Sequence, residues 1–391
     1  MVGGPSSSAS GSSGENDLAL VMTGGGARAA YQVGLLRWLG RHFPGLRVPI
    51  LTGVSAGAIN AVHLACRPGS FRARAEELAI LWAGLDLEKV FRVDTLSMLG
   101  GFLRWGTRLA SGGERAAPRV RGLVDTSPLH ETLEKGLRIS AEGCLPGIGE
   151  KLERGALQAV AVTATSYGTG QSVTWVEGRS IGEWERAHRK SERTRLCVNH
   201  VMASAALPMV FPAVEVDGAW YGDGGIRLSA PLSPAVHLGA ERILAISTRY
   251  ARTRGEADQP VVAGYPPPAT VAGVLLNAIF LDLLDADALR LERINQLVAK
   301  VPPQKRGDLR PVRLLVLRPS RDLGKLANEF ESDLPFAFRT LTRGLGTRET
   351  HSNDLLSLLM FQPDYLKALL ELGEADAEKE AGRLHAFLEE G

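Results

Sequence analysis

The chain has 391 residues, of which 45% are hydrophobic and 23% charged, a balance that is ordinary for a globular protein with one large core or two modest ones. Its 45 Lys and Arg residues nearly balance its 43 Asp and Glu residues, so the overall charge does not favour binding to nucleic acid. We therefore expect no nucleic-acid partner.

Residues 1–16 are rich in glycine and serine and have neither a basic start nor an apolar centre. This composition predicts a disordered leader and not a signal peptide. We expect no membrane-spanning segment, so that any contact with a membrane would be made from its surface. The cysteines, Cys66, Cys144 and Cys197, are widely spaced and match no metal-binding pattern. They predict reduced thiols in a cytoplasmic protein.

The first ordered feature is an apolar run at residues 18–22, which predicts a buried parallel strand. A glycine loop follows it and leads into a helix expected over residues 27–42; the loop reads Thr23-Gly24-Gly25-Gly26-Ala27-Arg28. Bare backbone N–H groups in such a loop can approach a negatively charged oxygen closely. Arg28 has two interpretations, a contact to a substrate head group or an ion pair that stabilises the fold.

The glycine loop also fits the dinucleotide-binding pattern, through Gly24, Gly26 and Ala29. That function needs an acidic residue about 20 positions further on, at the end of the second strand. Here residues 50–52 read Ile-Leu-Thr, so a binding site for an oxyanion is favoured over a nucleotide site.

The second apolar run, residues 48–51, is followed by Thr52-Gly53-Val54-Ser55-Ala56-Gly57 and then by a segment of small residues that predicts a helix. A strand, a G-x-S-x-G sequence and a helix in this order are typical of a nucleophile elbow. Gly53 and Gly57 would leave room for the sharp turn, while Ser55 would present its hydroxyl beside a helix N-terminus. The alternative is a glycine-rich turn with an incidental serine.

Residues 71–85 predict a helix, and residues 87–121 form an irregular insertion that is both apolar and basic. The insertion is interpreted as a lid or a membrane-facing patch, or else as a helical pair packed on the core. Strands are expected at residues 156–165 and 171–176, and a short helix at 198–207. A short strand at 214–216 precedes Gly222-Asp223-Gly224-Gly225, where a tight hairpin turn is the alternative to a catalytic role for Asp223.

The remaining sequence predicts a buried strand at 243–247, a loop rich in proline and glycine at 252–268, and a last strand at 313–317. Between these two strands, residues 271–301 predict one long helix. Its expected apolar stripe is Leu275, Leu276, Ile279, Leu283, Leu289, Ile294 and Leu297. Helices are clearest at 353–360 and 363–372. This alternation of strands and helices predicts an α/β protein with a mainly parallel sheet between helical layers.

The glycine loop, the serine motif and the late Asp223-Gly224-Gly225, in this order, resemble the bacterial patatin-like phospholipases. The stretch 203–208 is also similar to the segment that precedes the catalytic aspartate in that family. The resemblance covers residues 18 to about 247. One departure is Ala29, where the family usually has glycine; because alanine tolerates helical backbone, we expect position 29 to be helical already.

The resemblance implies a lipid acyl hydrolase, of phospholipase A or lysophospholipase type, that cleaves carboxylic esters of membrane lipids without metal or cofactor. It implies a Ser55–Asp223 dyad without histidine and an oxyanion hole formed by Gly24, Gly25, Gly26, Ala27 and Arg28. Gly53, Gly57, Gly224 and Gly225 would support the motifs. The catalytic domain would span 17–250 and a mostly helical extension 251–391.

Two other functions remain open. One is an α/β-hydrolase with a full triad, in which His237 or His351 would follow Asp223. The other is a lipid-binding module that has lost its activity. The expected substrate is a phospholipid or lysophospholipid at a membrane surface. The protein is expected to be cytoplasmic and to associate with the inner surface of the membrane. The C-terminal helices could support a homodimer.

Overall fold

The computed structural model describes residues 17–92, 122–179, 181–258, 262, 264–280, 283–335, 338–340 and 352–389. The strands are β1 (Leu18–Met22), β2 (Ile50–Val54), β3 (Ala159–Ser166), β4 (Ser172–Gly178), β5 (Glu185–Arg186), β6 (Arg189–Arg193), β7 (Val214–Val216), β8 (Ala219–Asp223), β9 (Arg242–Ile246) and β10 (Arg313–Leu317).

The helices lie between and beyond these strands. The α-helices are α1 (Ala29–His42), α2 (Ala56–Cys66), α3 (Phe71–Ala83), α4 (Leu87–Val90), α6 (Ser127–Leu137), α7 (Pro146–Glu153), α8 (Val198–Ser204), α9 (Ser233–His237), α10 (Arg254–Ala257), α11 (Pro268–Phe280), α12 (Leu283–Ala299), α13 (Leu323–Glu329), α15 (Asp354–Leu359), α16 (Pro363–Lys379) and α17 (Ala381–Glu389). The 3-10 helices are η1 (Gly26–Arg28), η2 (Gly224–Ile226), η3 (Pro303–Lys305) and η4 (Glu331–Asp333).

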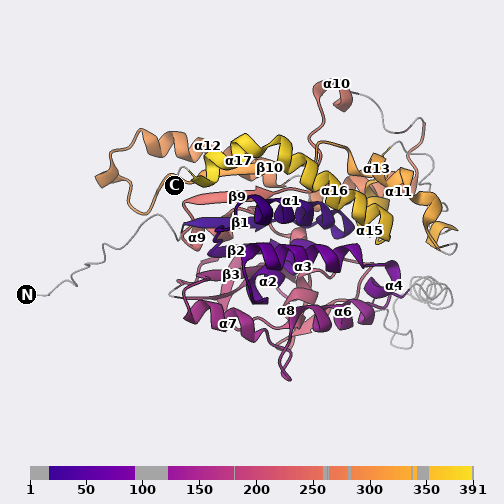
Figure 1. Cartoon of the computed structure of the whole chain (residues 1–391), viewed down its shortest axis with the longest axis horizontal. Coiled ribbons are helices and arrows are strands. Elements are labelled where there is room, and N and C mark those ends of the chain that lie inside the picture. The colour runs from indigo at the N-terminus through magenta and orange to yellow at the C-terminus, as the bar shows by residue number, and fades with distance from the viewer. Residues whose placement is uncertain are drawn as a thin grey trace, which may run out of the picture.

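One mixed sheet forms the centre, with strands in the order β10-β9-β1-β2-β3-β4-β6-β5. The five strands from β10 to β3 are parallel, whereas β4 and β8 both run antiparallel to β3. Helices cover both faces, as Figure 1 shows. The predicted α/β fold with a mainly parallel sheet is therefore confirmed.

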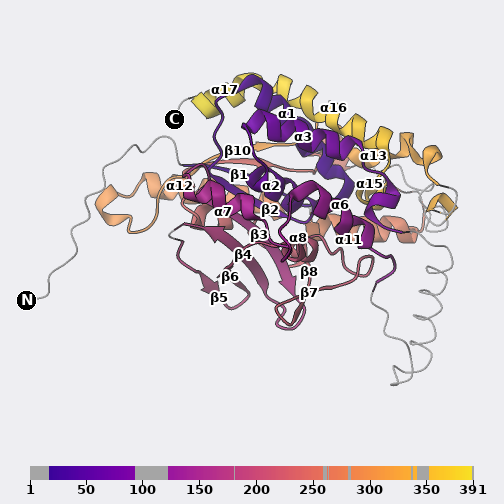
Figure 2. The same ribbon diagram turned by 60° about the horizontal axis from the view of Figure 1, so that its bottom comes forward.

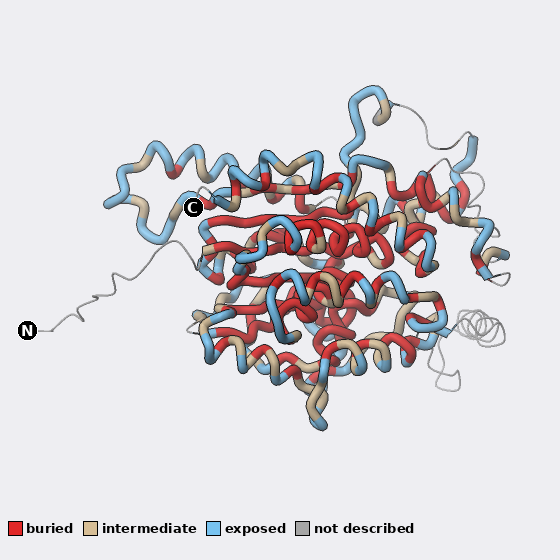
Figure 3. Tube along the Cα trace, viewed as in Figure 1, coloured by how far each residue is buried: buried red, intermediate tan, exposed pale blue. Residues whose placement is uncertain are grey.

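The side chains of β1 show how the two faces are built. Leu18, Leu20 and Met22 belong to the larger core cluster with α1, α2 and α16, while Ala19 and Val21 belong to a second cluster with α9 and α12. Because successive side chains on a strand point to opposite faces, an almost continuous apolar strand is buried on both sides. The buried segments in Figure 3 accordingly run through the middle of the molecule.

The C-terminal part is tied closely to the first half of the chain. β10 pairs with β9 in parallel, and α16 packs alongside α1 (Figure 2). A Cβ atom on Gly34 would lie 2.1 Å from the carbonyl oxygen of Leu370, so only glycine allows the two helices this approach. At the end of the sheet that carries Ser55, α15 then packs on η1 and α11 packs on η2 and α15.

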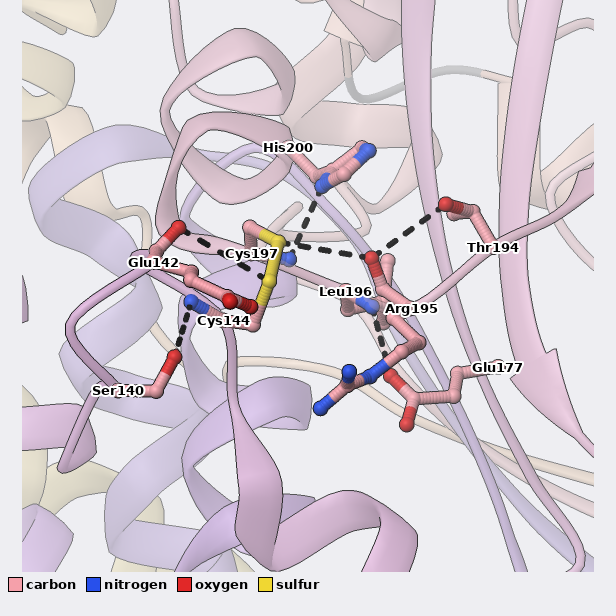
Figure 4. The surroundings of a disulfide bond; sticks show 9 residues. All are labelled: Ser140, Glu142, Cys144, Glu177, Thr194, Arg195, Leu196, Cys197 and His200. Atoms are coloured by element: carbon pink, nitrogen blue, oxygen red, sulfur yellow. Dashed lines mark hydrogen bonds between the residues drawn. A yellow bond between two sulfur atoms is a disulfide. The ribbon is translucent and has the colours of Figure 1, made fainter.

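Two expectations about the chain differ from the structure. Cys144 and Cys197 are joined by a disulfide, so the prediction of reduced thiols was wrong for this pair (Figure 4). A backbone bridge places their Cα atoms 3.8 Å apart although 53 positions separate them in sequence, which spacing alone did not reveal. Cys66 is a buried free thiol. The cysteines therefore give no argument for a reducing compartment.

The second difference concerns the predicted long helix. The stretch Pro268–Ala299 has the length and composition of a membrane-spanning helix, with a mean hydropathy of 1.7 over its most apolar 18 residues, and it includes positions 281–282 outside the described residues. The stretch meets this criterion by length and composition only, and 25% of its most apolar 18 residues are buried. Its predicted apolar stripe is also only partly covered, because Leu275, Leu289 and Leu297 are 58%, 58% and 62% exposed.

Candidate active site

The predicted nucleophile stands at the carboxyl end of β2, where ligands commonly bind in parallel sheets. Ser55 has φ 57° and ψ −133°, a left-handed conformation that is uncommon for a residue other than glycine. α2 begins at the next residue, and the turn is closed by the Ala58 amide, which donates to the Ser55 carbonyl at 2.9 Å. The side chain is held on a strained turn next to a helix N-terminus, and the residue is 7% exposed.

The register of strand β3 brings the predicted base, Asp223, close to Ser55. Val54, the last residue of β2, pairs with Thr163 of β3, and the following residue Ala164 pairs with Asp223 at the end of β8. Two neighbouring positions of β3 thus connect Ser55 with Asp223, which lies 168 positions further along the chain. Both residues line one cavity of about 40 Å³.

The carboxylate of Asp223 is fully buried. Its Oδ1 atom accepts a hydrogen bond from the Gly225 amide at 2.8 Å, whereas Oδ2 is buried without a hydrogen-bond partner among the described residues. Burial raises the pKa of Asp223 to about 7, and the neighbouring Ser55 hydroxyl and the Gly225 amide oppose this rise. The free oxygen and the raised pKa leave a carboxylate that can accept a proton close to neutral pH.

The glycine loop lies directly against the serine. A Cβ atom on Gly24 would lie 3.0 Å from the Ser55 Cβ atom, and Gly25 and Gly26 line the cavity. Gly25 has φ 148°, and the loop is anchored by the Thr248 hydroxyl, which donates to the Gly24 carbonyl at 2.7 Å. In the described part of the chain, the amides of Gly24, Gly25 and Gly26 have no hydrogen-bond partner, so they are available to an incoming anion.

The arginine of the loop has another role in the structure. The Arg28 amide donates to the Gly25 carbonyl at 3.1 Å, and the side chain is 3% exposed. Its guanidinium pairs with the Asp354 carboxylate at 2.6 Å and donates to the Ser357 hydroxyl at 2.6 Å. Of its two interpretations, the ion pair is the one observed, and it ties η1 to α15. α1 begins at Ala29, so the expected helical conformation at this position is confirmed.

Ser204 is a site residue to which sequence reasoning gave no role. Its hydroxyl accepts a hydrogen bond from the Ser55 amide at 3.0 Å and donates to the Thr163 carbonyl at 2.6 Å. It therefore connects the elbow to β3 from the end of α8. The only signal for it was its place in the stretch 203–208, which precedes the aspartate.

The supporting glycines stand at close backbone contacts. Gly57 would place a Cβ atom 2.4 Å from the Met22 carbonyl oxygen, and Gly224 would place one 2.0 Å from the Thr163 carbonyl oxygen. A Cβ atom on Gly53 would lie 2.4 Å from the Gly57 carbonyl oxygen. These contacts hold β1, β2 and β3 around the elbow.

A second cavity of about 50 Å³ extends from Ser55 between α2, α3 and α6. Its wall includes Ile59, Trp82, Leu85 and Leu133, and among the described residues that line it only Ser55 and Thr132 carry hydroxyl groups. A pocket of this chemistry suits a hydrocarbon chain, although it is small in the described conformation.

Neither cavity at Ser55 is lined by a histidine of the described residues. His237 instead stacks on Trp184, with ring centroids 4.7 Å apart, on the face of the sheet that carries α9. His351 lies outside the described residues, as does most of the insertion, residues 93–121. Within the described residues, no group of three or more His, Cys, Asp or Glu side chains is placed to hold a metal ion.

Comparison with solved structures gives several similar folds. VipD from Legionella pneumophila is 14% identical, with 91% of this chain and 67% of that chain covered and a TM-score of 0.38. Human GIVD cytosolic phospholipase A2, in complex with methyl gamma-linolenyl fluorophosphonate, is 16% identical. The match covers 96% of this chain and 59% of the human chain, with a TM-score of 0.45. The chain thus spans about three fifths of the human chain. No curated protein sequence matches it.

The family model for patatin-like phospholipases matches residues 20–236. The match includes the glycine loop, Ser55 and Asp223, and it covers more than half of the chain. The chain therefore belongs to the patatin-like phospholipase family.

Proposed function

We propose that this protein is a lipid acyl hydrolase in which Ser55 is the nucleophile and Asp223 the general base. The observation that carries the proposal is the pairing of a strained, buried serine with a buried carboxylate whose Oδ2 atom has no partner. A serine hydroxyl is a weak nucleophile unless a base takes its proton, and here the carboxylate can do so directly.

The reaction begins when the Ser55 oxygen attacks the carbonyl carbon of a carboxylic ester and Asp223 accepts the hydroxyl proton. The negative charge that develops on the carbonyl oxygen is stabilised by the free amides of Gly24, Gly25 and Gly26. Asp223 then returns the proton to the departing alcohol, which leaves Ser55 acylated. Water then attacks the acyl carbon while the same carboxylate accepts its proton. Asp223 passes this proton to the Ser55 oxygen as the acyl bond breaks, which releases the fatty acid and restores the serine hydroxyl.

The apolar cavity beside Ser55 supports a fatty acyl group as the part of the substrate that is bound. A phospholipase A or lysophospholipase activity fits this site, because the ester carbonyl would lie at the serine while the head group stays outside. We place the enzyme at a membrane surface, where such substrates are found. We also propose that the insertion 87–121 is a lid or a membrane-facing patch. A dimer through the C-terminal helices is a further proposal.

The first test measures the release of fatty acid from phosphatidylcholine and lysophosphatidylcholine vesicles. Ser55→Ala should abolish release, and Asp223→Asn should lower it at least about a thousandfold because the base is lost. His237→Ala is the control and should keep wild-type activity, since its ring packs on Trp184 away from the site. A folded but inactive His237→Ala variant would favour the triad, and an inactive wild type would favour the lipid-binding module.

The second test is the pH dependence of the reaction of a soluble fluorophosphonate with Ser55. Since the ionised form of Asp223 is the base and burial raises its pKa to about 7, the second-order rate should rise about tenfold per pH unit below 7 and level off above it. A rate that is already constant from pH 5 upward would contradict a base with this pKa.

The third test concerns the acyl cavity. Leu133 is 3% exposed and lines this cavity, so Leu133→Trp should fill it. Hydrolysis of a palmitoyl ester should fall at least about tenfold relative to hydrolysis of a butyryl ester by the same variant. The ratio corrects for any loss of folded protein, because misfolding lowers both rates equally. An unchanged ratio would remove this cavity from the substrate site.

A further inference from the structure

The turn that ends α8 lies between the two reacting residues. It belongs to the stretch 203–208, which is similar in sequence to the segment before the catalytic aspartate of the family but has no part in the proposed reaction. Residues 204–206, which we name the α8 turn, are buried, with exposures of 0%, 7% and 3%. The Ala206 amide donates to the Ala203 carbonyl at 3.3 Å and closes the turn. The contacts of this turn show how it can affect the reaction.

The first residue of the α8 turn holds the backbone of the nucleophile. The Ser204 hydroxyl donates to the Thr163 carbonyl at 2.6 Å and accepts from the Ser55 amide at 3.0 Å. Because a hydroxyl has one hydrogen to donate, its bond to Thr163 directs a lone pair toward the Ser55 amide. The left-handed backbone of Ser55, with φ 57°, persists only where its surroundings fix it. The Ser204 hydroxyl supplies such a contact on the amide side of Ser55.

The last residue of the α8 turn holds the backbone of the base. The Ala206 carbonyl accepts a hydrogen bond from the Asp223 amide at 2.9 Å. Between them in sequence, Ala205 lines both cavities at Ser55. Three consecutive residues thus contact the nucleophile, the cavities and the base, in addition to the pairings of β3 with β2 and β8. A shift of the α8 turn would change the separation of Ser55 and Asp223.

The other end of α8 is attached to the loop before α7. Cys197 is the residue that precedes the helix, and it forms the disulfide with Cys144 (Figure 4). The Cys197 amide donates to His200 Nδ1 at 3.0 Å, and the Val198 amide donates to the Gly143 carbonyl at 2.9 Å. α8 is therefore held at both ends, which limits how far the α8 turn can move.

We propose that Ser204 is a positioning residue, whose hydroxyl fixes the backbone of Ser55 so that the Ser55 hydroxyl is directed at the Asp223 carboxylate. The proposal rests on the proposed function, because this orientation matters only if Asp223 takes the Ser55 proton. Ser204 is not among the described residues that line the two cavities at Ser55, so it acts through Ser55 and not on the substrate. Proton transfer needs a separation of roughly 2.6–3.2 Å, and a misplacement of about 1 Å can cost about a hundredfold in rate.

The test uses variants of the full-length protein that separate the hydroxyl from the volume of the side chain. Ser204→Thr keeps a hydroxyl, Ser204→Val has nearly the same shape without one, and Ser204→Ala removes the hydroxyl without adding volume. Ser191→Ala on β6 is the matched control. The Ser191 hydroxyl is also buried and also joins two backbone groups, because it accepts from the Trp184 amide at 2.8 Å and donates to the Trp184 carbonyl at 3.4 Å.

Hydrolysis of a soluble butyryl ester is measured per reactive site, counted by fluorophosphonate labelling of Ser55 carried to completion, so that unfolded protein does not enter the rate. Ser204→Ala and Ser204→Val should lower kcat and kcat/KM by the same factor, roughly ten- to hundredfold. Ser204→Thr and Ser191→Ala should stay close to the wild type. In every variant the rate should still rise up to about pH 7, because Asp223 stays buried. Equal kcat values for Ser204→Thr and Ser204→Val, or wild-type kcat in Ser204→Ala, would overturn the proposal.

Amide hydrogen exchange measures the same contact without catalysis. Exchange of the Ser55 amide, resolved by mass spectrometry with fragmentation, should be at least about tenfold faster in Ser204→Val than in Ser204→Thr, because the amide loses its acceptor. Equal exchange in these two variants would overturn the positioning role. If Ser55 reacts in no protein, the wild type included, the proposed function fails, and the exchange rates still decide whether Ser204 holds the Ser55 backbone.

Discussion

The burial of one carboxylate is the constraint on which the site depends. Asp223 is fully buried, and only one of its oxygens has a hydrogen-bond partner, so its charged form is held at a cost in free energy. The register of β2, β3 and β8 keeps it there, because neighbouring residues of β3 pair with Val54 and Asp223. The Thr165 hydroxyl adds a hydrogen bond to the Asp223 carbonyl at 2.8 Å. The sheet thus keeps the ionised Asp223 carboxylate buried, although this charged group would be more stable in water.

This arrangement sets activity against stability. A carboxyl group whose pKa is raised from about 3.9 in the unfolded chain to about 7 in the fold binds its proton more tightly when folded. Its contribution to the free energy of unfolding is present below pH 4 and is lost as the pH rises toward 7. The ionised form, which is the base in the proposed reaction, is therefore the less stable one. The strained backbone of Ser55 adds a second local cost in free energy.

Much of the fold could be predicted from the sequence because its signals are local. Apolar runs gave the strands β1, β2, β3 and β9, and the glycine and serine motifs placed Gly24 to Gly26 and Ser55 at strand ends. Contacts between distant segments could not be predicted in this way. The disulfide of Cys144 with Cys197 depends on a backbone bridge, and the ion pair of Arg28 with Asp354 joins residues 326 positions apart. The exposure of Leu275 was missed because periodicity shows that an apolar face exists and does not show what covers it.

The central claim is that Ser55 and Asp223 form the reacting pair, and mapping of a covalent adduct tests it most directly. After reaction with an alkyl fluorophosphonate, peptide mass spectrometry should locate one adduct, on Ser55, in the wild type and in His237→Ala. Asp223→Asn, folded as judged by circular dichroism, should carry almost none. An adduct on another residue, or labelling of Asp223→Asn at the wild-type rate, would contradict the account.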